Sequence, residues 1–182
     1  MRIGKFARAL VAIAVAATAA YWYWSPHIAM RRMQDAAQRS DTEALRAHID
    51  FPALRENMRT QAAAALGRKM GDPKNNPFAA FGTAIGTAFA DQVLQVLVRT
   101  ETIAASLRTG RWDPMGVDPV AKPGAEQKVF WVYERDGMNR VVVRPRPTGE
   151  PTDGSRPAFV LVRHGFADWK LAGITLPPLT HN

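Results

Sequence analysis

Residues 25–61, SPHIAMRRMQDAAQRSDTEALRAHIDFPALRENMRTQ, decide how this chain folds. They follow an apolar N-terminus and open the part of the chain that can fold as a soluble domain. The first pair, Ser25-Pro26, is typical of a helix start, because serine caps free backbone N–H groups and proline suits the first helical position. We expect this helix to end near Arg39. Its inner face is a set of apolar residues spaced three and four apart: Ala29, Met33, Ala36 and Ala37.

Two more helix starts lie in the same stretch. Ser40-Asp41-Thr42-Glu43 is a capping box, which predicts a short helix with Leu45 and Ile49 turned inward. Asp50-Phe51-Pro52 predicts the next helix, with the Asp50 carboxylate as its cap. A loop is expected over residues 71–77, which are rich in Pro, Gly and Asn. The apolar residues of this third helix form one stripe at four-residue steps: Leu54, Met58, Ala62, Leu66 and Met70.

The N-terminal segment, residues 1–24, has the layout of an export signal that is either cleaved or kept as a membrane anchor. Three cations, Arg2, Lys5 and Arg8, precede the uncharged run Ala9–Trp24, which is a little shorter than the ~20 residues that cross a bilayer. A small-x-small site ending at Ala19 favours cleavage. The aromatic run over residues 21–24 favours an anchor, because such rings prefer the boundary between membrane and water. We expect an uncleaved anchor.

The charge and the cysteine count exclude several function classes. The chain has 24 Lys and Arg against 16 Asp and Glu, a formal charge of +8, which favours anionic partners. The cations are scattered rather than gathered in a run, so no specific nucleic-acid partner is expected. With no cysteine, the chain has no thiol catalysis, no disulfides and no Cys-ligated zinc.

The remaining helices are predicted between residues 77 and 110. Residues 77–98 are apolar, with large side chains such as Phe89 at four-residue steps, and they read as a core helix. Asp91 within them argues against the alternative, a second membrane span. One more short helix is expected from Thr100 to about Gly110.

The pattern then changes to that of strands. Residues 111–124 read as a linker, and Lys128–Arg135 and Met138–Arg144 flank Asp136-Gly137, a signal for a two-residue hairpin turn. A second hairpin is expected from residues 158–164 and 168–176, around Gly165-Phe166-Ala167. In this order of elements, one face of the sheet is buried against the helices.

The opening stretch resembles the start of a bacterial family known as domain of unknown function 2939. The likeness is carried by an aromatic-Ser-Pro start and by a (V/I)-D-F-P-x-L-R-x-x-(L/M)-x-x-Q signature, here Ile49, Asp50, Phe51, Pro52, Leu54, Arg55, Met58 and Gln61. The end of the chain is similar to the end of that family at Trp169, Lys170, Leu171, Ile174, Leu176 and Pro177. The closing strand pair also looks like the end of nuclear-transport-factor-2-like domains.

The resemblance implies a membrane-anchored or exported envelope protein of Gram-negative bacteria and brings no catalytic residues. With the cations ahead of the apolar run, the positive-inside rule then predicts a single span in the inner membrane. The N-terminus is expected in the cytoplasm and residues 25–182 in the periplasm. The alternative is a soluble periplasmic protein, cleaved near Ala19.

Two sets of candidate site residues follow. Asp50, Arg55 and Gln61 form a candidate polar cluster, although capping by Asp50 and pairing of Arg55 with Asp50 or Glu56 explain these residues without a site. The candidate ligand-binding residues are aromatic, and ordinary core packing is the alternative for each of them: Trp131, Tyr133, Trp169 and Phe89. The four histidines lack metal-ligand spacing, so neither a metal nor a cofactor is expected: His27, His48, His164 and His181.

We therefore expect an α+β protein with an anchor (1–24), a helical part (25–110) and a linker plus four-stranded antiparallel meander (111–176) of one domain, and a tail (177–182). The predicted function is a non-catalytic interaction module at the membrane, with an envelope protein or an anionic lipid as partner. The alternative is a carrier of a lipid or aromatic ligand, which needs a cavity of roughly 300 Å³ or more. A third reading, a small hydrolase or isomerase, needs a His–carboxylate pair in that cavity. The oligomeric state stays open.

Overall fold

A computed structural model of the chain describes residues 4–70, 98–112, 129–147 and 156–176. Their elements, in order, are helices α1 (Lys5–Gln38), α2 (Thr42–Ala47), α3 (Phe51–Met70) and α5 (Thr100–Thr109), and strands β1 (Val129–Arg135), β2 (Arg140–Pro147), β3 (Ala158–Arg163) and β4 (Trp169–Thr175). The predicted α+β order, helices first and then an antiparallel meander, is confirmed. The helix expected over 77–98, most of the linker and the tail lie outside the described residues.

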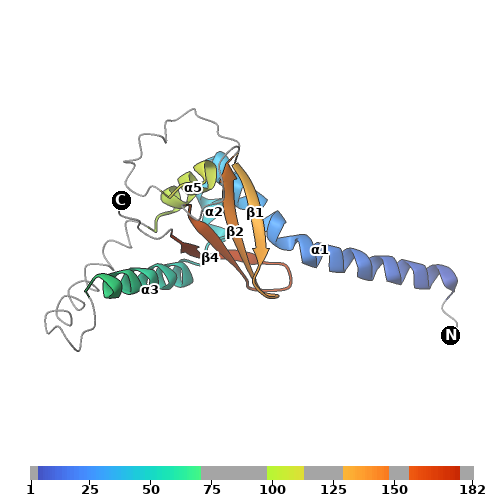
Figure 1. Cartoon of the computed structure of the whole chain (residues 1–182). Coiled ribbons are helices and arrows are strands. Elements are labelled where there is room, and N and C mark those ends of the chain that lie inside the picture. Colours follow the sequence, from blue (N-terminus) through green and yellow to red (C-terminus); the bar gives the residue numbers. More distant parts are fainter. Residues whose placement is uncertain (1–3, 71–97, 113–128, 148–155, 177–182) are drawn as a thin grey trace.

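Helix α1 is one unbroken helix with Pro26 inside it, so the helix start predicted at Ser25 is wrong. Proline removes the N–H that would bond the carbonyl four residues earlier, which is that of Trp22. The Ser25 hydroxyl donates to this carbonyl instead, at 2.7 Å, and the helix continues. Figure 1 shows the result: the first half of α1 projects from the fold and the second half enters it. The predicted inner face of the second half is confirmed, because all its members are buried: Ala29, Met33, Ala36 and Ala37.

The four strands lie in the order β1-β2-β3-β4, each antiparallel to the next. The β1–β2 turn is longer than the two residues predicted. Gly137 supplies the left-handed backbone, at φ +83°, but the Asp136 N–H bonds the Arg140 carbonyl at 3.0 Å and encloses three residues. The second turn is closed by the His164 N–H on the Asp168 carbonyl at 2.9 Å. In a meander of this order, both turns lie at the same end of the sheet.

One face of the sheet and one side of each helix form the core. The strands contribute residues of this face that are less than 2% exposed: Val141, Val143, Phe159, Leu161, Trp169, Leu171 and Ile174. The helices and their connections contribute Met30, Met33, Leu45, Ile49, Leu54, Met58, Ile103 and Leu107. The helices thus cover one face of the sheet, as expected.

Helix α3 runs along the β4 edge of the sheet (Figure 1). Just before it, Ile49 forms a parallel bridge with Leu171, so the chain adds a short strand-like piece to that edge. The predicted stripe of α3 is buried at Leu54 and Met58, but Ala62 is exposed. The reason is that α3 has passed the end of β4 by this point. The side chains of Leu66 and Met70 lie outside the described residues.

Helix α5 ends where the sequence predicts. Gly110 follows its last residue in the left-handed conformation, at φ +67°, and its N–H bonds the Ser106 carbonyl at 2.8 Å. A Cβ atom at Gly110 would lie 2.8 Å from that of Pro145, so only glycine fits between α5 and the sheet.

Candidate functional site

The junction between α1 and the sheet is the most elaborate side-chain arrangement in the described part of the chain. At its centre the Trp169 indole, which has no exposed surface, donates from Nε1 to the Ser25 hydroxyl at 2.7 Å. The same hydroxyl donates to Trp22 O, so one serine both repairs the helix at Pro26 and satisfies a buried indole. The projecting half of α1 is therefore joined to the sheet without a flexible linker.

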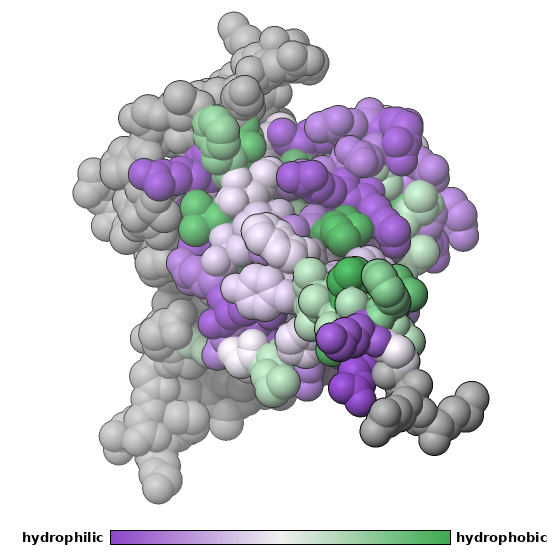
Figure 2. All heavy atoms as spheres, turned by 90° about the vertical axis from the view of Figure 1, so that its right-hand side faces the viewer, coloured by the Kyte–Doolittle hydropathy of each residue, from purple (hydrophilic) through white to green (hydrophobic). Residues whose placement is uncertain are grey.

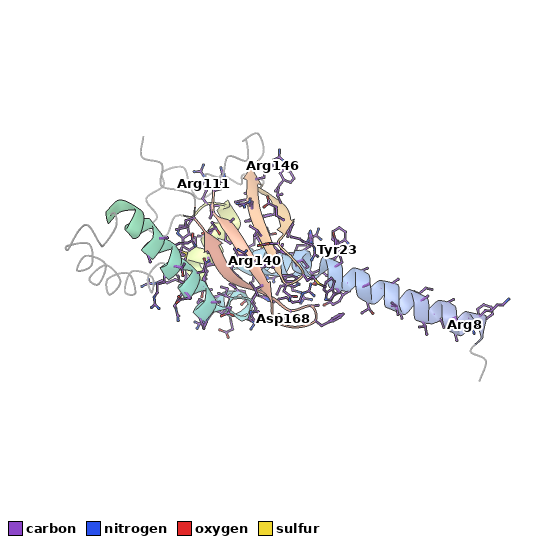
Figure 3. The ribbon with its side chains drawn as sticks, turned by 60° about the horizontal axis from the view of Figure 1, so that its bottom comes forward. Arg8, Tyr23, Arg111, Arg140, Arg146 and Asp168 are labelled. Atoms are coloured by element: carbon purple, nitrogen blue, oxygen red, sulfur yellow. The ribbon has the colours of Figure 1, made fainter. Side chains whose placement is uncertain are left out.

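Two arginines at the turn end of the sheet hold the aromatic segment of α1. The Arg135 guanidinium lies 4.3 Å from the centre of the Tyr23 ring and donates from Nη2 to the Tyr23 carbonyl. The Arg163 guanidinium lies between two indoles, 4.0 Å from Trp22 and 4.5 Å from Trp169. Stacking of a guanidinium group on the face of an aromatic ring is favourable. Figure 3 places Tyr23 where α1 leaves the folded domain and Arg8 near its far end.

Burial affects the titration of this junction and of the neighbouring edge. Tyr133 stacks on His27 with ring centres 4.0 Å apart, and burial raises the pKa of the Tyr133 hydroxyl. At the β4 edge, burial first and then Arg32 lower the pKa of His48, against the opposing effect of Asp168. Both groups are thus held neutral near pH 7.

The three residues of the predicted polar cluster lie at separate contacts. Asp50 caps α3, with Oδ1 accepting from Ala53 N at 3.1 Å, and its Oδ2 lies 3.2 Å from His164 Nε2. The Arg55 guanidinium lies 5.8 Å from the centre of the Phe51 ring. None of the contacts among the described residues joins Asp50, Arg55 and Gln61 to one another.

Gln61 and Asn57 bond the exposed backbone edge of β4. Gln61 donates from Nε2 to the Ile174 carbonyl at 2.6 Å and accepts from Leu176 N at 3.0 Å. Asn57 Oδ1 accepts from Ile174 N at 3.1 Å. A Cβ on Gly173 would lie 2.9 Å from the Asn57 side chain, so the glycine lets α3 approach this closely. Side-chain amides thus replace a neighbouring strand.

The aromatic ligand candidates do not converge. Trp131 is half-buried against Phe159 at 5.6 Å, Tyr133 lines a cavity of about 180 Å³ beside His27, and Trp169 is enclosed in the core. Phe89 lies outside the described residues. Core packing and the α1 junction account for the positions of the three that are described.

A second hollow, of about 400 Å³, lies among the helices. Figure 1 shows that α2, α3 and α5, which supply its lining, lie on the side of the fold away from the projecting half of α1. Arg46 and Arg55 flank the Phe51 ring, each at 5.8 Å, and Arg99 stands at the start of α5 with Thr100 and Glu101. Within the described part, none of the three guanidinium groups is in an ion pair. The hollow therefore offers clustered positive charge beside an aromatic ring.

The geometry of the described residues gives little support to a catalytic or metal-binding site. No group of three or more His, Asp or Glu in the described ranges is placed to hold a metal ion. The His164–Asp50 pair is the His–carboxylate combination that hydrolysis would require, but both side chains are partly exposed at a strand end, 36% and 22%. Asp50 is already engaged as a helix cap.

Sequence reasoning missed Ser25 as acceptor for Trp169, the two arginines of the junction, and Asn57 at the β4 edge. One of these contacts, between Arg163 and Trp169, had a signal in the sequence. The two residues occupy paired positions on either side of the second hairpin turn, which places both side chains on one face of the sheet. Nothing local marked Tyr23 as the partner of Arg135.

The family model described as a protein of unknown function, DUF2939, matches residues 15–105, which is half of the chain. The matched region includes Ser25, Asn57 and Gln61 and ends before the sheet. None of the curated proteins and none of the solved structures matches the chain. The likeness to nuclear-transport-factor-2-like domains therefore stays a prediction. Through the match to its N-terminal half, the chain belongs to the DUF2939 family of proteins of unknown function.

Proposed function

We propose that this protein is a single-span, membrane-anchored interaction module without catalytic activity. Its N-terminus lies in the cytoplasm, and residues 25–182 lie on the periplasmic side of the inner membrane. The observation that carries the proposal is α1 itself. Among the described elements it is the helix long and apolar enough to cross a membrane, and its apolar half is fully exposed. Leu10 and Ile13, for example, are 68% and 65% exposed.

An exposed apolar helix of this length requires a non-aqueous surrounding. Figure 2, which looks towards the free end of α1, shows hydrophobic side chains gathered in front of a largely hydrophilic domain surface. The aromatic residues Tyr21–Trp24 follow the apolar part directly, as membrane–water boundaries favour. Arginines of the sheet hold the Trp22 and Tyr23 rings, so this aromatic segment is fixed to the folded domain.

The arginine hollow supports an anionic partner for this module. Arg46, Arg55 and Arg99 are brought together from three elements, and guanidinium groups bind carboxylates and phosphates in two-point geometry. The hollow opens among helices away from the anchor, so its partner is an acidic segment of another envelope protein. The ligand-carrier alternative has less support, because Trp131, Tyr133 and Trp169 do not line one cavity.

The absence of cysteine permits a direct test of the anchor. Single cysteines at Gly4 and at Lys170 are treated in intact cells, made permeable at the outer membrane only, with a maleimide that does not cross the inner membrane. Labelling at Lys170 alone supports the proposed orientation, and labelling at Gly4 alone contradicts it. Cleavage near Ala19 would instead appear as a shortened mature chain in the soluble fraction.

The interaction itself is tested by photo-crosslinking in the cell envelope. A photoreactive residue replaces Arg99 in the hollow or, as a control, the exposed Glu43 of α2. An adduct that forms from position 99, not from position 43, and that disappears in R46E/R55E supports the hollow as the binding surface. An adduct that survives the double charge reversal contradicts it.

A further inference from the structure

The turn end of the sheet carries two exposed hydrophobic side chains beside α1. Met138, in the β1–β2 turn, is 68% exposed, and Phe166, in the β3–β4 turn, is 60% exposed. The core does not explain these large apolar residues at the tips of polar hairpin turns, because neither of them belongs to it. Both tips lie at the end of the sheet where α1 emerges, because Arg135 and Arg163 from the adjoining strands contact Tyr23 and Trp22 there.

Phe166 faces the apolar half of α1 across a groove of about 500 Å³. The groove is lined by Phe166 and by one side of the helix: Ala14, Val15, Thr18, Ala19 and Trp22. Thr18, its polar member, donates its hydroxyl to the Ala14 carbonyl at 2.8 Å and presents only its methyl group. The turn is held in this place because Arg163 donates to the Phe166 carbonyl while stacking on Trp22.

The position of the groove along the helix decides what fills it. At 1.5 Å per residue, the groove covers ~12 Å of α1 below Trp22, inside the segment that must lie in the bilayer if α1 spans it. The uncharged run Ala9–Trp24 is already shorter than the ~20 residues of a full span. All of it is therefore needed inside the bilayer, and none of it can separate the domain from the membrane surface. A membrane that accommodates this run must meet the turn end of the sheet.

We propose that the two hairpin tips, at Phe166 and Met138, dock into the outer surface of the bilayer beside α1, with a phospholipid acyl chain in the groove. This inference rests on the proposed membrane span. The docked tips and the Ser25–Trp169 junction fix the orientation of the domain on the membrane and point the arginine hollow away from it. The charges at this end suit the headgroup layer, since Arg135 and Arg163 stack on aromatic rings and Asp136 is paired with Arg140.

The test places a nitroxide spin label at single cysteines in the full chain, reconstituted into phosphatidylcholine–phosphatidylglycerol vesicles. The labelled positions are Phe166 and Met138 at the tips, Leu10 in the span and Arg146 as an aqueous control. Arg146 is exposed and lies in β2 at the end of the sheet away from the turns, as Figure 3 shows. Collision rates with oxygen, which concentrates in lipid, and with a water-soluble nickel chelate give the depth of each label.

The proposal predicts that labels at Phe166 and Met138 collide with oxygen several-fold more than with the nickel chelate, whereas the label at Arg146 shows the reverse. Water-like values at both tips, with a lipid-like value at Leu10, overturn the docking and leave the anchor intact. A water-like value at Leu10 instead overturns the span itself. Protection of Phe166 from both reagents overturns the lipid assignment, because it shows that protein, such as a second copy of the chain, fills the groove.

Discussion

Helices α1 and α3 attach to the same sheet by different means. Helix α1 lies against the end of its inner face, and its contacts are aromatic rings, two arginines and one buried hydroxyl. Helix α3 lies along the β4 edge, and beside its buried Leu54 and Met58 it uses two amide side chains that bond backbone groups. The face of a sheet offers side chains, so attachment there depends on burial and shape. The edge offers unpaired N–H and C=O groups, so attachment there depends on hydrogen bonds.

The difference has a consequence for energy. Removing a fully buried ring leaves a cavity and exposes its neighbours, whereas removing an amide at a partly exposed edge allows water to take its place. Perturbing the face attachment should therefore cost more stability than perturbing the edge. All the stability predictions below refer to the free energy of unfolding of the full chain in detergent micelles, from urea titrations followed by circular dichroism.

The largest effect is expected for Trp169→Ala. The indole is fully buried, bonds Ser25 and stacks on Arg163, so its removal should lower the free energy of unfolding by ~3–5 kcal/mol. The matched control is Trp24→Ala, because this indole is 55% exposed and its loss should cost less than ~1 kcal/mol. Equal losses from the two variants would contradict a special role for the junction.

Ser25→Ala should follow, at ~1–3 kcal/mol, because it leaves the Trp169 N–H buried without an acceptor. Thr18→Ala is the control within the same helix, since the Thr18 hydroxyl, like that of Ser25, bonds a carbonyl of the preceding turn but has no second partner among the described residues. Its effect should be within ~0.5 kcal/mol. In a Trp169→Phe background the cost of Ser25→Ala should shrink. An unchanged cost would mean that Ser25 acts only on the helix at Pro26.

At the edge, Gln61→Ala should lower the free energy of unfolding by ~1–2 kcal/mol. It removes the bonds to the Ile174 carbonyl and to Leu176 N, which water can partly replace at this half-buried site. Thr60→Ala, at the neighbouring exposed position, is the control and should change little. A loss as large as that of Trp169→Ala would erase the distinction between face and edge.

The sequence predicted what local patterns determine. The inner face of α1, the end of α5 near Gly110 and the second hairpin follow from spacing and turn chemistry over a few residues. The helix start at Ser25 failed because Ser-Pro fits equally a first turn and a helix that continues. The choice between a helix that starts at Ser25 and one that continues through it depends in part on Trp169, which is 144 positions later in the chain. Likewise, Gln61 was predicted to belong to a polar cluster with Asp50 and Arg55, but its partner Ile174 lies 113 positions away.

The smallest effect expected is a pH dependence at the β4 edge. The His48 carbonyl accepts from Leu171 N at 2.9 Å, and burial lowers the pKa of its imidazole, with Arg32 and Lys170 acting in the same direction. The unfolded chain therefore binds a proton at His48 more readily than the folded chain. The contribution of His48 to stability is complete above its unfolded pKa of ~6.5 and is lost as the pH falls through and below that value.

His48→Gln keeps a polar side chain that does not titrate. As the pH is lowered from 7.5 to 5.5, the original chain should therefore lose more unfolding free energy than this variant. The backbone bond to Leu171 remains in both proteins, which isolates the imidazole from the bridge that holds the edge. Parallel pH profiles of unfolding free energy for the two proteins would show that His48 has the same pKa in the folded and the unfolded chain. The edge would then owe its stability to amide and backbone hydrogen bonds alone, and the contrast with the aromatic junction at α1 would be sharper.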